Sequence, residues 1–597
     1  MKEIRSITRL AVGLSRIPED LIGLLSSKVF GEGIEISIVC EDDALSSEKI
    51  AAAGIKTYKG TEGVKFYLDL LRTMSLTEGA DNDTTIIISG GAAELAYALK
   101  LFKAEKPDMK WDFTERLNVI ICGGEIGYTD DIPYSQKNFS EEARAIKEIL
   151  DSGIEPVFLT AYSVSDEYKN ETRCKEYVSD RLLRKALKAF KGGKGPDESQ
   201  ILRDCVRLHL DIAVSGENKG ELLIDSRERP ESPNARLYIK GGKYENLIEE
   251  ICKSDTLNKE FVRPEESCPI SEAGENHVKR VILDADTGSD DAISIMCAAL
   301  CGRLEIEAIC SVWGNSNAEN TADNAARVMS LMGKRVLVYK GLDTAICKYQ
   351  ELCRRDRGNL KPVEVNGEVL HMHVDTLPIP DASYKREEKN AVSFYIEYFS
   401  KSENRGTSIL ATGPLSNLGM ALLIKPDIAE NIGEIIVMGG GLLKANITPF
   451  SEANFNHDPE AADIVLNCGT RVILIPLDLT HRAVIKKDEI EEIKALGNPC
   501  ALFAAELLRQ RSLIHDVTQP LYIPHAATVH DAMTAAYAAD NSIVTKLLPV
   551  RIKVIKGGDC EGHCTLERRK NGDRPNCEIA LAADRGKFVG FIKESLA

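Results

Sequence analysis

The segment Val281–Met296 constrains this chain more than any other, because it places several carboxylates on one tight turn. An apolar run of strand character, Val281–Leu283, leads into the sequence DADTGSDD, whose acids are Asp284, Asp286, Asp290 and Asp291. Gly288 lets the backbone turn, and residues 292–300 then read as a buried helix. We therefore predict a strand-to-helix turn at the carboxyl edge of a parallel sheet, where open α/β folds bind ligands.

Like charges this close repel one another, so they stay ionised together only where a cation or several hydrogen bonds offset the repulsion. Because every candidate ligand atom is an oxygen, the cation predicted here is a hard one, Ca²⁺ or Mg²⁺. A group of solvated acids that cap a helix is the simpler alternative, and a single Asp-Asp pair would favour it. Four acids around a glycine at a strand end favour a metal site.

The length of 597 residues predicts two or more domains, each large enough for a core of its own. The formal net charge of −17 argues against a nucleic-acid backbone or an anionic membrane as the main partner. We find no apolar run of membrane-spanning length and no signal-peptide pattern, which favours a cytoplasmic location.

Apolar, strand-like runs alternate with helical stretches in the first part of the chain. The strand-like runs are 35–40, 84–89, 118–122 and 156–159, and the helical stretches are 92–102 and 141–151. This alternation predicts the α/β class, with a mainly parallel open sheet flanked by helices. A polar stretch at 253–278, which contains Pro and Gly, reads as a linker between domains.

The pattern of the first half returns after this linker in the same order. Residues 434–441, EIIVMGGG, resemble 118–124, NVIICGG, and SEANF at 451–455 resembles SQKNF at 135–139. Two further pairs of segments, 407–418 with 85–95 and 471–476 with 155–159, follow in step. We therefore predict two tandem copies of one domain, at 1–252 and at 279–597.

The two copies differ at the acidic turn and at two later positions. In the first copy, Gly13 aligns with Asp284 of the second, Ser15 with Asp286, Gln136 with Glu452, and Arg203 with His530. Because these replacements remove charge-dependent chemistry, we predict that the first copy is catalytically inactive. A second active site with different chemistry is the alternative.

Further polar groups of the second half follow predicted strand ends or begin a helix. They are Asn315, the Thr412-Gly-Pro turn, the Met438-Gly-Gly-Gly turn with Asn446, the pair Glu452 and Asn454, and His530-Asp531. The carboxyl ends of parallel strands meet at one edge of a sheet, so we expect these groups to converge on the acidic turn.

Through these motifs, residues 280–597 resemble the inosine-uridine-preferring nucleoside hydrolase family, the Ca²⁺-dependent N-ribohydrolases. The family opening Asp-x-Asp-Pro-Gly-x-Asp-Asp is present here as DADTGSDD, with Thr287 in place of proline. The resemblance implies an enzyme that hydrolyses the N-glycosidic bond of ribonucleosides, as in purine or pyrimidine salvage. The first half is then a degenerate copy of a nucleoside-hydrolase-like domain.

The resemblance also implies a role for each matching residue. The predicted Ca²⁺ ligands are Asp286, Asp291, the backbone carbonyl of Thr412, and Asp531. The predicted substrate-binding residues are Asp290 and Asn454 for the ribose hydroxyls, Asn315 as a residue that lines the site, and Met438, Asn446 and Glu452 for the 5′-hydroxyl end. Asp286 would be the general base on the Ca²⁺-bound water, and His530 would help to protonate the leaving base.

One departure from the family pattern concerns the nucleobase. The family carries a His-Gly-x-x-Gly-like loop after the third strand, whereas residues 349–374 are long and charged here and lack that spacing. His371 or His373 could reach the base from this divergent lid, or could lie at the surface. The residues therefore support the ribose half of the site and leave the preferred nucleobase open.

Two alternatives come from other functional classes. The start of the acidic turn also resembles the Asp-x-Asp-x-Thr opening of haloacid-dehalogenase-type phosphatases, in which Asp284 would be a covalent nucleophile and Mg²⁺ the metal. A nucleoside sensor without turnover would use the same pocket, and the degenerate first copy motivates that alternative. The hydrolase reading predicts a small-molecule ribonucleoside as the partner, and two fused copies could replace the contact of a homodimer.

Overall fold

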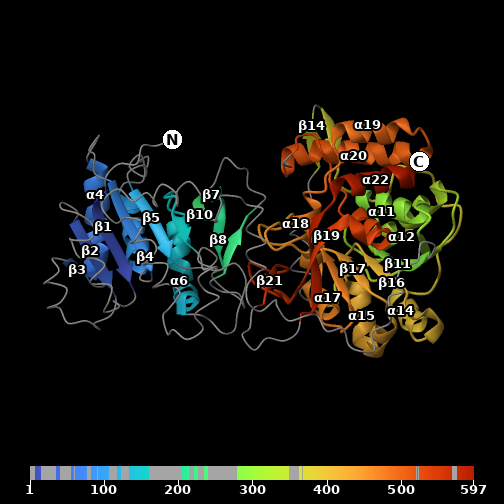
Figure 1. The fold of residues 1–597 in the computed structure, drawn as a ribbon, viewed down its shortest axis with the longest axis horizontal. Helices are drawn as coiled ribbons and strands as arrows, with labels where there is room; N and C mark the ends of the chain where they lie inside the picture. The colour runs from blue at the N-terminus through green and yellow to red at the C-terminus, as the bar shows by residue number, and fades with distance from the viewer. Residues whose placement is uncertain are drawn as a thin grey trace. The chain divides into compact units, whose positions relative to one another are not determined.

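The computed structural model describes about two thirds of the chain, including nearly all of its second half. The described residues are 7–14, 35–40, 56–58, 61–76, 83–89, 92–105, 117–122, 134–159, 205–213, 221–225, 234–238, 278–347, 362–365, 367–519, 521, 523–567 and 575–597. The chain divides into two compact units with a boundary at residue 256 (Figure 1). The predicted linker, 253–278, lies outside the described residues except for Val278.

The first unit contains an eight-stranded sheet with the order β3-β2-β1-β4-β5-β6-β10-β7. Its strands are β1 (Ile7–Leu14), β2 (Glu35–Cys40), β3 (Lys56–Tyr58), β4 (Asp83–Ser89), β5 (Leu117–Cys122), β6 (Val157–Leu159), β7 (Cys205–Leu208) and β10 (Ala235–Tyr238). Only the pair β10 and β7 is antiparallel. The helices described in this unit are α4 (Thr61–Leu76), α5 (Ala92–Glu105) and α6 (Tyr134–Leu150), and β8 (Leu210–Ile212) and β9 (Leu222–Ile224) form a hairpin. The four strands predicted in this half are confirmed.

The second unit contains an eight-stranded sheet with the order β13-β12-β11-β16-β17-β18-β22-β19. Its strands are β11 (Lys279–Ala285), β12 (Leu304–Ser311), β13 (Leu337–Lys340), β16 (Ser408–Ala411), β17 (Ile435–Met438), β18 (Val472–Ile475), β19 (Val544–Val550) and β22 (Cys577–Ala583). Only β22 and β19 pair in antiparallel fashion. Two hairpins accompany this sheet, β14 (Val363–Val365) with β15 (Glu368–Leu370), and β20 (Ile552–Val554) with β21 (Cys564–Leu566).

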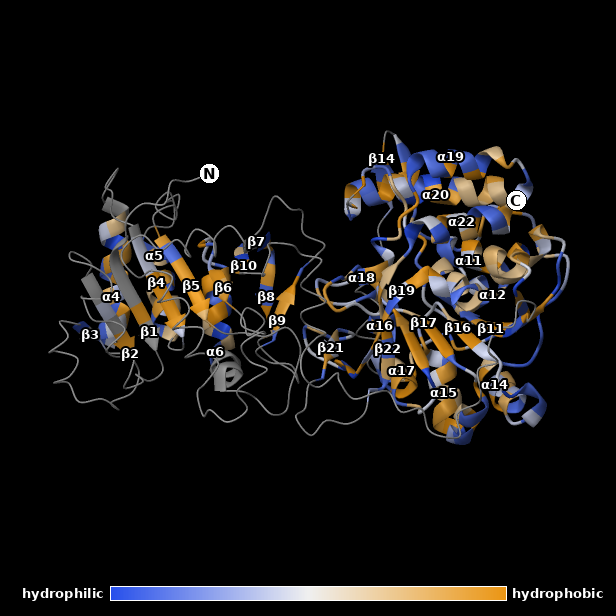
Figure 2. Ribbon diagram, in the orientation of Figure 1, coloured by the Kyte–Doolittle hydropathy of each residue, from blue (hydrophilic) through white to orange (hydrophobic). Residues whose placement is uncertain are grey.

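Helices cover both faces of this second sheet (Figure 1). One face carries α11 (Ser289–Leu300), α12 (Ala318–Leu331), α21 (Ala532–Ala539) and α22 (Arg585–Leu596), with α20 (Pro499–Thr518) packed on α11 and α19 (Lys487–Ala495) on α20. The other face carries α14 (Ala391–Phe399), α15 (Ser416–Ile424) and α17 (Pro459–Leu466). A sheet buried on both sides needs apolar strands, and Figure 2 shows the central strands as largely hydrophobic.

The course of the chain across this sheet reverses between β11 and β16. From β11 the chain moves to β12 and β13 on one side, and from β16 it moves to β17 and β18 on the other. Such a switch point leaves a crevice beyond the carboxyl ends of two neighbouring strands, where open α/β folds bind ligands. Asp286 follows β11 and Thr412 follows β16, so the acidic turn lies at this switch point.

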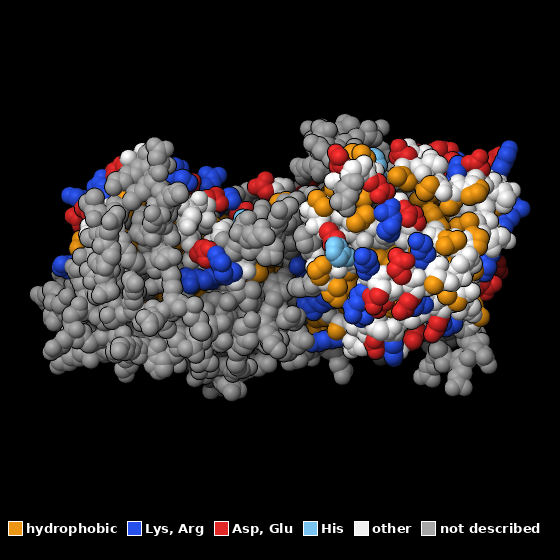
Figure 3. Space-filling model, turned by 90° about the horizontal axis from the view of Figure 1, so that it is seen from above, with side chains coloured by type: hydrophobic (Ala, Val, Ile, Leu, Met, Phe, Trp, Pro, Cys, Tyr) orange, Lys and Arg blue, Asp and Glu red, His pale blue; other side chains and the backbone are white. Residues whose placement is uncertain are grey.

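The surface of the second unit has mixed charge. Figure 3 shows acidic and basic side chains interspersed with apolar ones over the described part of the face in view. No helix among the described residues is long and apolar enough to cross a membrane.

Candidate active site

Asp284, the first acid of the turn, is directed into the protein interior and away from the other three. Tyr395 of α14 donates a hydrogen bond to its Oδ2 at 2.8 Å, and Asn417 of α15 donates to its Oδ1 at 3.2 Å. Burial raises the pKa of Asp284 to about 7, although both hydrogen bonds oppose the shift. Asp284 therefore anchors β11 to the two helices on the far face.

Asp286 lies just beyond β11 and is held by the loop that follows β12. Its Oδ2 accepts a hydrogen bond from the backbone N–H of Asn315 at 2.8 Å. The preceding residue, Gly314, has a φ of 151°, and a Cβ there would lie 2.1 Å from Asp286 Oδ2. Only glycine fits this close approach without displacing the carboxylate. The predicted proximity of Asn315 to the acidic turn is therefore present in the structure.

Asp291 lies in the first turn of α11 and has donors on both carboxylate oxygens. Its Oδ2 accepts from the backbone N–H of Gly288 at 3.0 Å and from Asn315 Nδ2 at 3.1 Å. Its Oδ1 accepts from Thr412 Oγ1 at 2.8 Å, which joins the end of β16 to the start of α11. The side chain is fully buried, so these contacts fix its direction.

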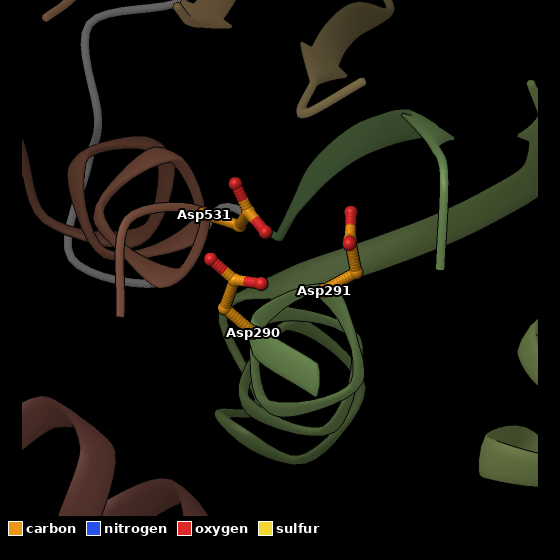
Figure 4. A group of neighbouring side chains, drawn as sticks. All are labelled: Asp290, Asp291 and Asp531. Carbon is orange, nitrogen blue, oxygen red and sulfur yellow. The ribbon is translucent and has the colours of Figure 1, made fainter. Parts of the chain in front are cut away.

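Three carboxylates meet at the switch point, and Figure 4 shows how they lie. Asp290 and Asp291 come from the start of α11, Asp531 immediately precedes α21, and ligand oxygens of all three lie within 4.8 Å of one another. Burial and the neighbouring negative charges raise the pKa values of Asp286 and Asp531 well above the usual range of an aspartate. A hard divalent cation among these oxygens would offset both the burial and the repulsion, so the donor set fits Ca²⁺ or Mg²⁺.

The predicted metal ligands differ in whether they belong to this group of three acids. Asp291 and Asp531 belong to the group of three, whereas Asp286 lies beside it and interacts with Asp291 electrostatically. The backbone carbonyl of Thr412 accepts a hydrogen bond from Asn454 Nδ2 at 2.8 Å and keeps a second lone pair for a metal. Asp290, predicted to bind ribose, occupies the third place in the group.

A buried arginine, which the sequence analysis did not identify, forms an ion pair with Asp290. Arg511 of α20 forms an ion pair with Asp290 Oδ2 at 3.1 Å, and both side chains are almost fully buried. Although burial opposes it, the charge of Arg511 lowers the pKa of Asp290 below its usual value. Asp290 is thus the one acid of this group that has a positively charged partner among the described residues.

The residues predicted for the 5′ end of the sugar lie together at the ends of β16 and β17. Glu452 caps α16 (Ala453–His457), where its two oxygens accept from three backbone N–H groups, those of Gly440, Asn454 and Phe455. Asn454 Nδ2 also donates to the carbonyl of Met438 at 3.2 Å. Asn446 Oδ1 accepts from the N–H of Ala453 at 2.9 Å.

His530, predicted to stand near the leaving base, is held between two threonines. Its Nδ1 lies 2.7 Å from the hydroxyl of Thr480, at the end of α18 (Leu477–Thr480), and its Nε2 lies 3.0 Å from that of Thr528. Thr528 Oγ1 also lies 2.8 Å from His515 Nε2. These contacts form one buried hydrogen-bonded chain that fixes the orientation of the His530 ring.

Sequence reasoning missed Arg511 and His515, although a signal for both was present. The two residues are four apart and continue the buried stripe of α20 that Ala504 and Leu508 begin. Charged and polar side chains at apolar positions of a helix require partners, because an unpaired buried charge is costly. A third missed residue, His481, follows α18, and its ring centroid lies 5.5 Å from that of His530.

The divergent lid reaches the acidic turn through His373. Its Nδ1 lies 3.5 Å from the backbone nitrogen of Ser289, and a Cβ on Gly288 would lie 2.4 Å from the same atom. His371, by contrast, is exposed. The hairpin β14–β15 precedes these residues, and residues 348–361 of the lid lie outside the described part of the chain.

The buried histidine His515 predicts a pH dependence of stability. Burial lowers its pKa to about 3, below the value of 6.5 expected in the unfolded chain. The unfolded state therefore binds a proton first as the pH falls, so stability is complete above about pH 6.5 and decreases toward pH 3. In His515→Gln, an amide can still meet Thr528, and we expect the free energy of unfolding of the wild type to fall relative to this variant by about 1.4 kcal/mol per pH unit between pH 6 and 4.

Urea unfolding at several pH values measures this difference. His371→Gln, at an exposed histidine, serves as the control and should leave the pH dependence of the wild type unchanged. A difference between the wild type and His515→Gln that does not vary with pH would show that His515 takes up its proton in the folded protein.

Comparison with known proteins gives matches to the second half of the chain. A family model described as inosine-uridine preferring nucleoside hydrolase matches residues 281–590. The pyrimidine-specific ribonucleoside hydrolase RihA of Enterobacter sp. (strain 638) is 29% identical over 330 residues, which cover 53% of this chain and 97% of that protein. The protein of the same name from Salmonella typhimurium is 30% identical over 325 residues, with coverage of 53% and 97%. Among solved structures, a purine-preferring ribonucleoside hydrolase from Gardnerella vaginalis is 28% identical, with coverage of 53% and 98% and a TM-score of 0.46.

Proposed function

The chain belongs to the inosine-uridine preferring nucleoside hydrolase family, and from that premise we propose that residues 279–597 hydrolyse the N-glycosidic bond of ribonucleosides with Ca²⁺. One observation carries the proposal: three buried carboxylates, Asp290, Asp291 and Asp531, converge at the switch point of the sheet. The relatives named ribonucleoside hydrolases support the reaction class.

Cleavage of an N-glycosidic bond builds positive charge on the ribosyl ring, as glycoside hydrolysis does. The buried acids of the site stabilise that charge, because water does not screen them there. Asp286 takes a proton from the attacking water, and the N–H of Asn315 holds its carboxylate in place. A bound Ca²⁺ would orient the sugar hydroxyls and lower the pKa of the attacking water.

The leaving base needs a proton or an equivalent hydrogen bond as the bond to ribose breaks. We assign this role to His530; because both of its ring nitrogens contact threonine hydroxyls, those of Thr480 and Thr528, the ring would exchange one of these contacts for the leaving base. The sugar is held by Asp290, Asn315 and Asn454, with Glu452 and Asn446 ordering the loop at its 5′ end. Because these polar groups would be left unpaired by a sugar without hydroxyls, the site discriminates against 2′-deoxyribonucleosides.

The phosphatase alternative requires an accessible Asp284. That carboxylate is 1% exposed and is occupied by Tyr395 and Asn417 on the far side of the sheet. The geometry therefore disfavours Asp284 as a nucleophile.

We also propose that the first unit is a degenerate copy of the second. Both sheets follow the same order when their eight strands are counted along the chain, 3-2-1-4-5-6-8-7, with one antiparallel pair at the same edge and a hairpin between the last two strands. Strand order is set by the whole chain path, so this agreement supports a duplication more strongly than short sequence matches do.

The strand registers support the same proposal residue by residue. One continuous row of paired residues in the first unit is Tyr58, Val39, Gly13, Ile88, Ile121, Phe158, Leu237 and Val206. The corresponding row in the second is Tyr339, Cys310, Asp284, Ala411, Val437, Leu474, Ile579 and Leu548. Anchored on the Gly-Gly turns after β5 and β17, the rows place Gly13 opposite Asp284, as the sequence alignment does.

The loss of chemistry in the first copy stays a prediction. Ser15 and Arg203 lie outside the described residues, and Gln136 lies in α6 with a side chain that is not described.

Release of reducing sugar from a panel of ribonucleosides tests the proposed function. We expect the full-length protein with Ca²⁺ to release ribose, and to process the matching 2′-deoxyribonucleosides more slowly by a factor on the order of 10⁴. The rank order of the panel identifies the preferred base. A protein that binds nucleosides but releases no sugar from any of them would overturn the hydrolase and support the sensor alternative.

A further inference from the structure

Arg511 connects three segments of the second unit at the edge of the acidic site. Its Nη2 pairs with Asp290 Oδ2 at 3.1 Å, its Nη1 donates to Ser289 Oγ at 2.8 Å, and its Nε donates to the carbonyl of Thr528 at 3.0 Å. Ser289 Oγ in turn donates to the carbonyl of Met372 at 3.0 Å. One buried guanidinium thereby ties α20 to the start of α11, to the approach to Asp531 and, through Ser289, to the lid.

The position of Asp290 raises a question that its proposed role in sugar binding does not answer. One of its oxygens lies within 4.8 Å of an oxygen of Asp291 and of one of Asp531, so distance alone would allow all three acids to bind one cation. Calcium accepts six to eight oxygens in flexible arrangements and would not exclude a further carboxylate. Some other contact must decide which acids bind the metal.

The partners of Asp290 and Asp291 differ in charge. Asp291 accepts hydrogen bonds only from neutral groups, the N–H of Gly288 and the side chains of Asn315 and Thr412, which leave its negative charge available to a cation. Asp290 shares Oδ2 with a full positive charge. Its Oδ1 is buried and has no hydrogen-bond donor among the described residues. One oxygen is thus taken by Arg511, and the other is free for a neutral hydroxyl donor.

We propose that Arg511 is a positioning residue that holds Asp290 out of the metal's ligand set and reserves its Oδ1 for a ribose hydroxyl. The proposal rests on the proposed function and deepens it, because it names the residue that divides the acid group between cation and sugar. The guanidinium suits this task because it is planar and always charged, and its fork of donors reaches three partners at once.

Calorimetry of Ca²⁺ binding to the variants Asp290→Asn and Arg511→Met tests which acids bind the cation. We expect Asp290→Asn to raise the dissociation constant for Ca²⁺ by about tenfold at most, because it removes a nearby negative charge, and Asp291→Asn to raise it by about 100-fold, because it removes a ligand. Arg511→Met frees Asp290 and should tighten Ca²⁺ binding severalfold. In the double variant with Asp290→Asn most of that gain should vanish, whereas a mere loss of a distant positive charge would tighten binding equally in both backgrounds.

Kinetics supply the second measurement. Arg511→Met should raise KM for a ribonucleoside by about tenfold or more, because the sugar then loses an oriented acceptor. Arg511→Lys keeps the charge but cannot reach all three partners, so Ca²⁺ affinity should return toward the wild-type value while KM stays raised. Arg509→Met is the matched control, since Arg509 lies on the same helix but is exposed and pairs with Glu368 and Glu506.

The outcomes separate this proposal from the proposed function. If Asp290→Asn weakens Ca²⁺ binding as much as Asp291→Asn does, Asp290 is a ligand and the proposal for Arg511 fails while the hydrolase stands. The same holds if Arg511→Met leaves Ca²⁺ affinity and KM unchanged. Should Arg511→Met not fold, Asp290→Asn and Arg511→Lys still decide the question. A wild-type protein that binds no Ca²⁺ would overturn both proposals together.

Discussion

Replacing Asp286 with asparagine is expected to lower kcat/KM for ribonucleoside hydrolysis by a factor between about 10² and 10⁴. Asparagine has nearly the same shape and can still accept the hydrogen bond from the N–H of Asn315, but it cannot take a proton from water. The loss should lie mainly in kcat, because proton transfer occurs in the transition state. Sugar release at saturating and limiting substrate measures the two constants separately.

Asp375→Asn is the matched control for this variant. Asp375 is an exposed acid just after the lid that accepts a hydrogen bond from Ser316, and its loss should change kcat/KM by less than about threefold. The Asp286 variant also reports on the first unit, because an active first copy would leave most of the sugar release intact. Activity within threefold of the wild type in Asp286→Asn, together with a loss of activity in Asp291→Asn, would remove Asp286 from the mechanism, whereas activity retained in both variants would point to the first copy.

Removal of the metal should have a comparable effect on activity and a separate effect on stability. We expect a chelator to lower sugar release by a factor on the order of 10² or more and added Ca²⁺ to restore it. Without a cation, three buried carboxylates within 4.8 Å repel one another in the folded state. At 100 times its dissociation constant, a ligand of the folded state adds about 2.7 kcal/mol of stability, which corresponds to a rise in Tm on the order of 5 °C.

Calorimetric unfolding with chelator, with Ca²⁺ and with Mg²⁺ measures the effect on stability. Ca²⁺ should raise Tm more than Mg²⁺, because Mg²⁺ requires nearly ideal octahedral geometry and loses its waters reluctantly. The gain should be absent in Asp291→Asn, which removes a predicted ligand. Full activity in the presence of chelator, with no change in Tm, would show that the acid group serves no metal.

Much of the fold follows from local sequence pattern. The alternation of apolar runs and helical stretches predicted strands that the structure places within one or two residues, such as 35–40 for β2 and 118–122 for β5. Local pattern could not show the antiparallel strand at the edge of each sheet, since β19 precedes β22 in the chain but pairs beyond it. Strand order depends on contacts between distant segments, which periodicity does not record.

Within the acidic turn, too, the sequence predicted the motif but not the direction of each side chain. The sequence presents Asp284 beside the other three acids, yet Asp284 still belongs to β11, where its side chain faces α14 and α15. Side chains alternate between the faces of a strand, and the strand end therefore decides which acids reach the crevice. Asp291 and Asp531, both predicted as metal ligands, lie in one group of oxygens, and Asp531 reaches that group through the packing of α21 against α11.

The sequence by itself determined that this chain has an α/β fold with a carboxylate-rich turn at a strand end, because periodicity and turn chemistry are local properties. It also indicated the family, through motifs that each occupy a few consecutive residues. Only the tertiary structure decided which acids lie together at the site and which of them pairs with Arg511. Arg511 and its partner Ser289 are 222 residues apart, and a buried charge is stable only where folding brings its counter-charge within reach.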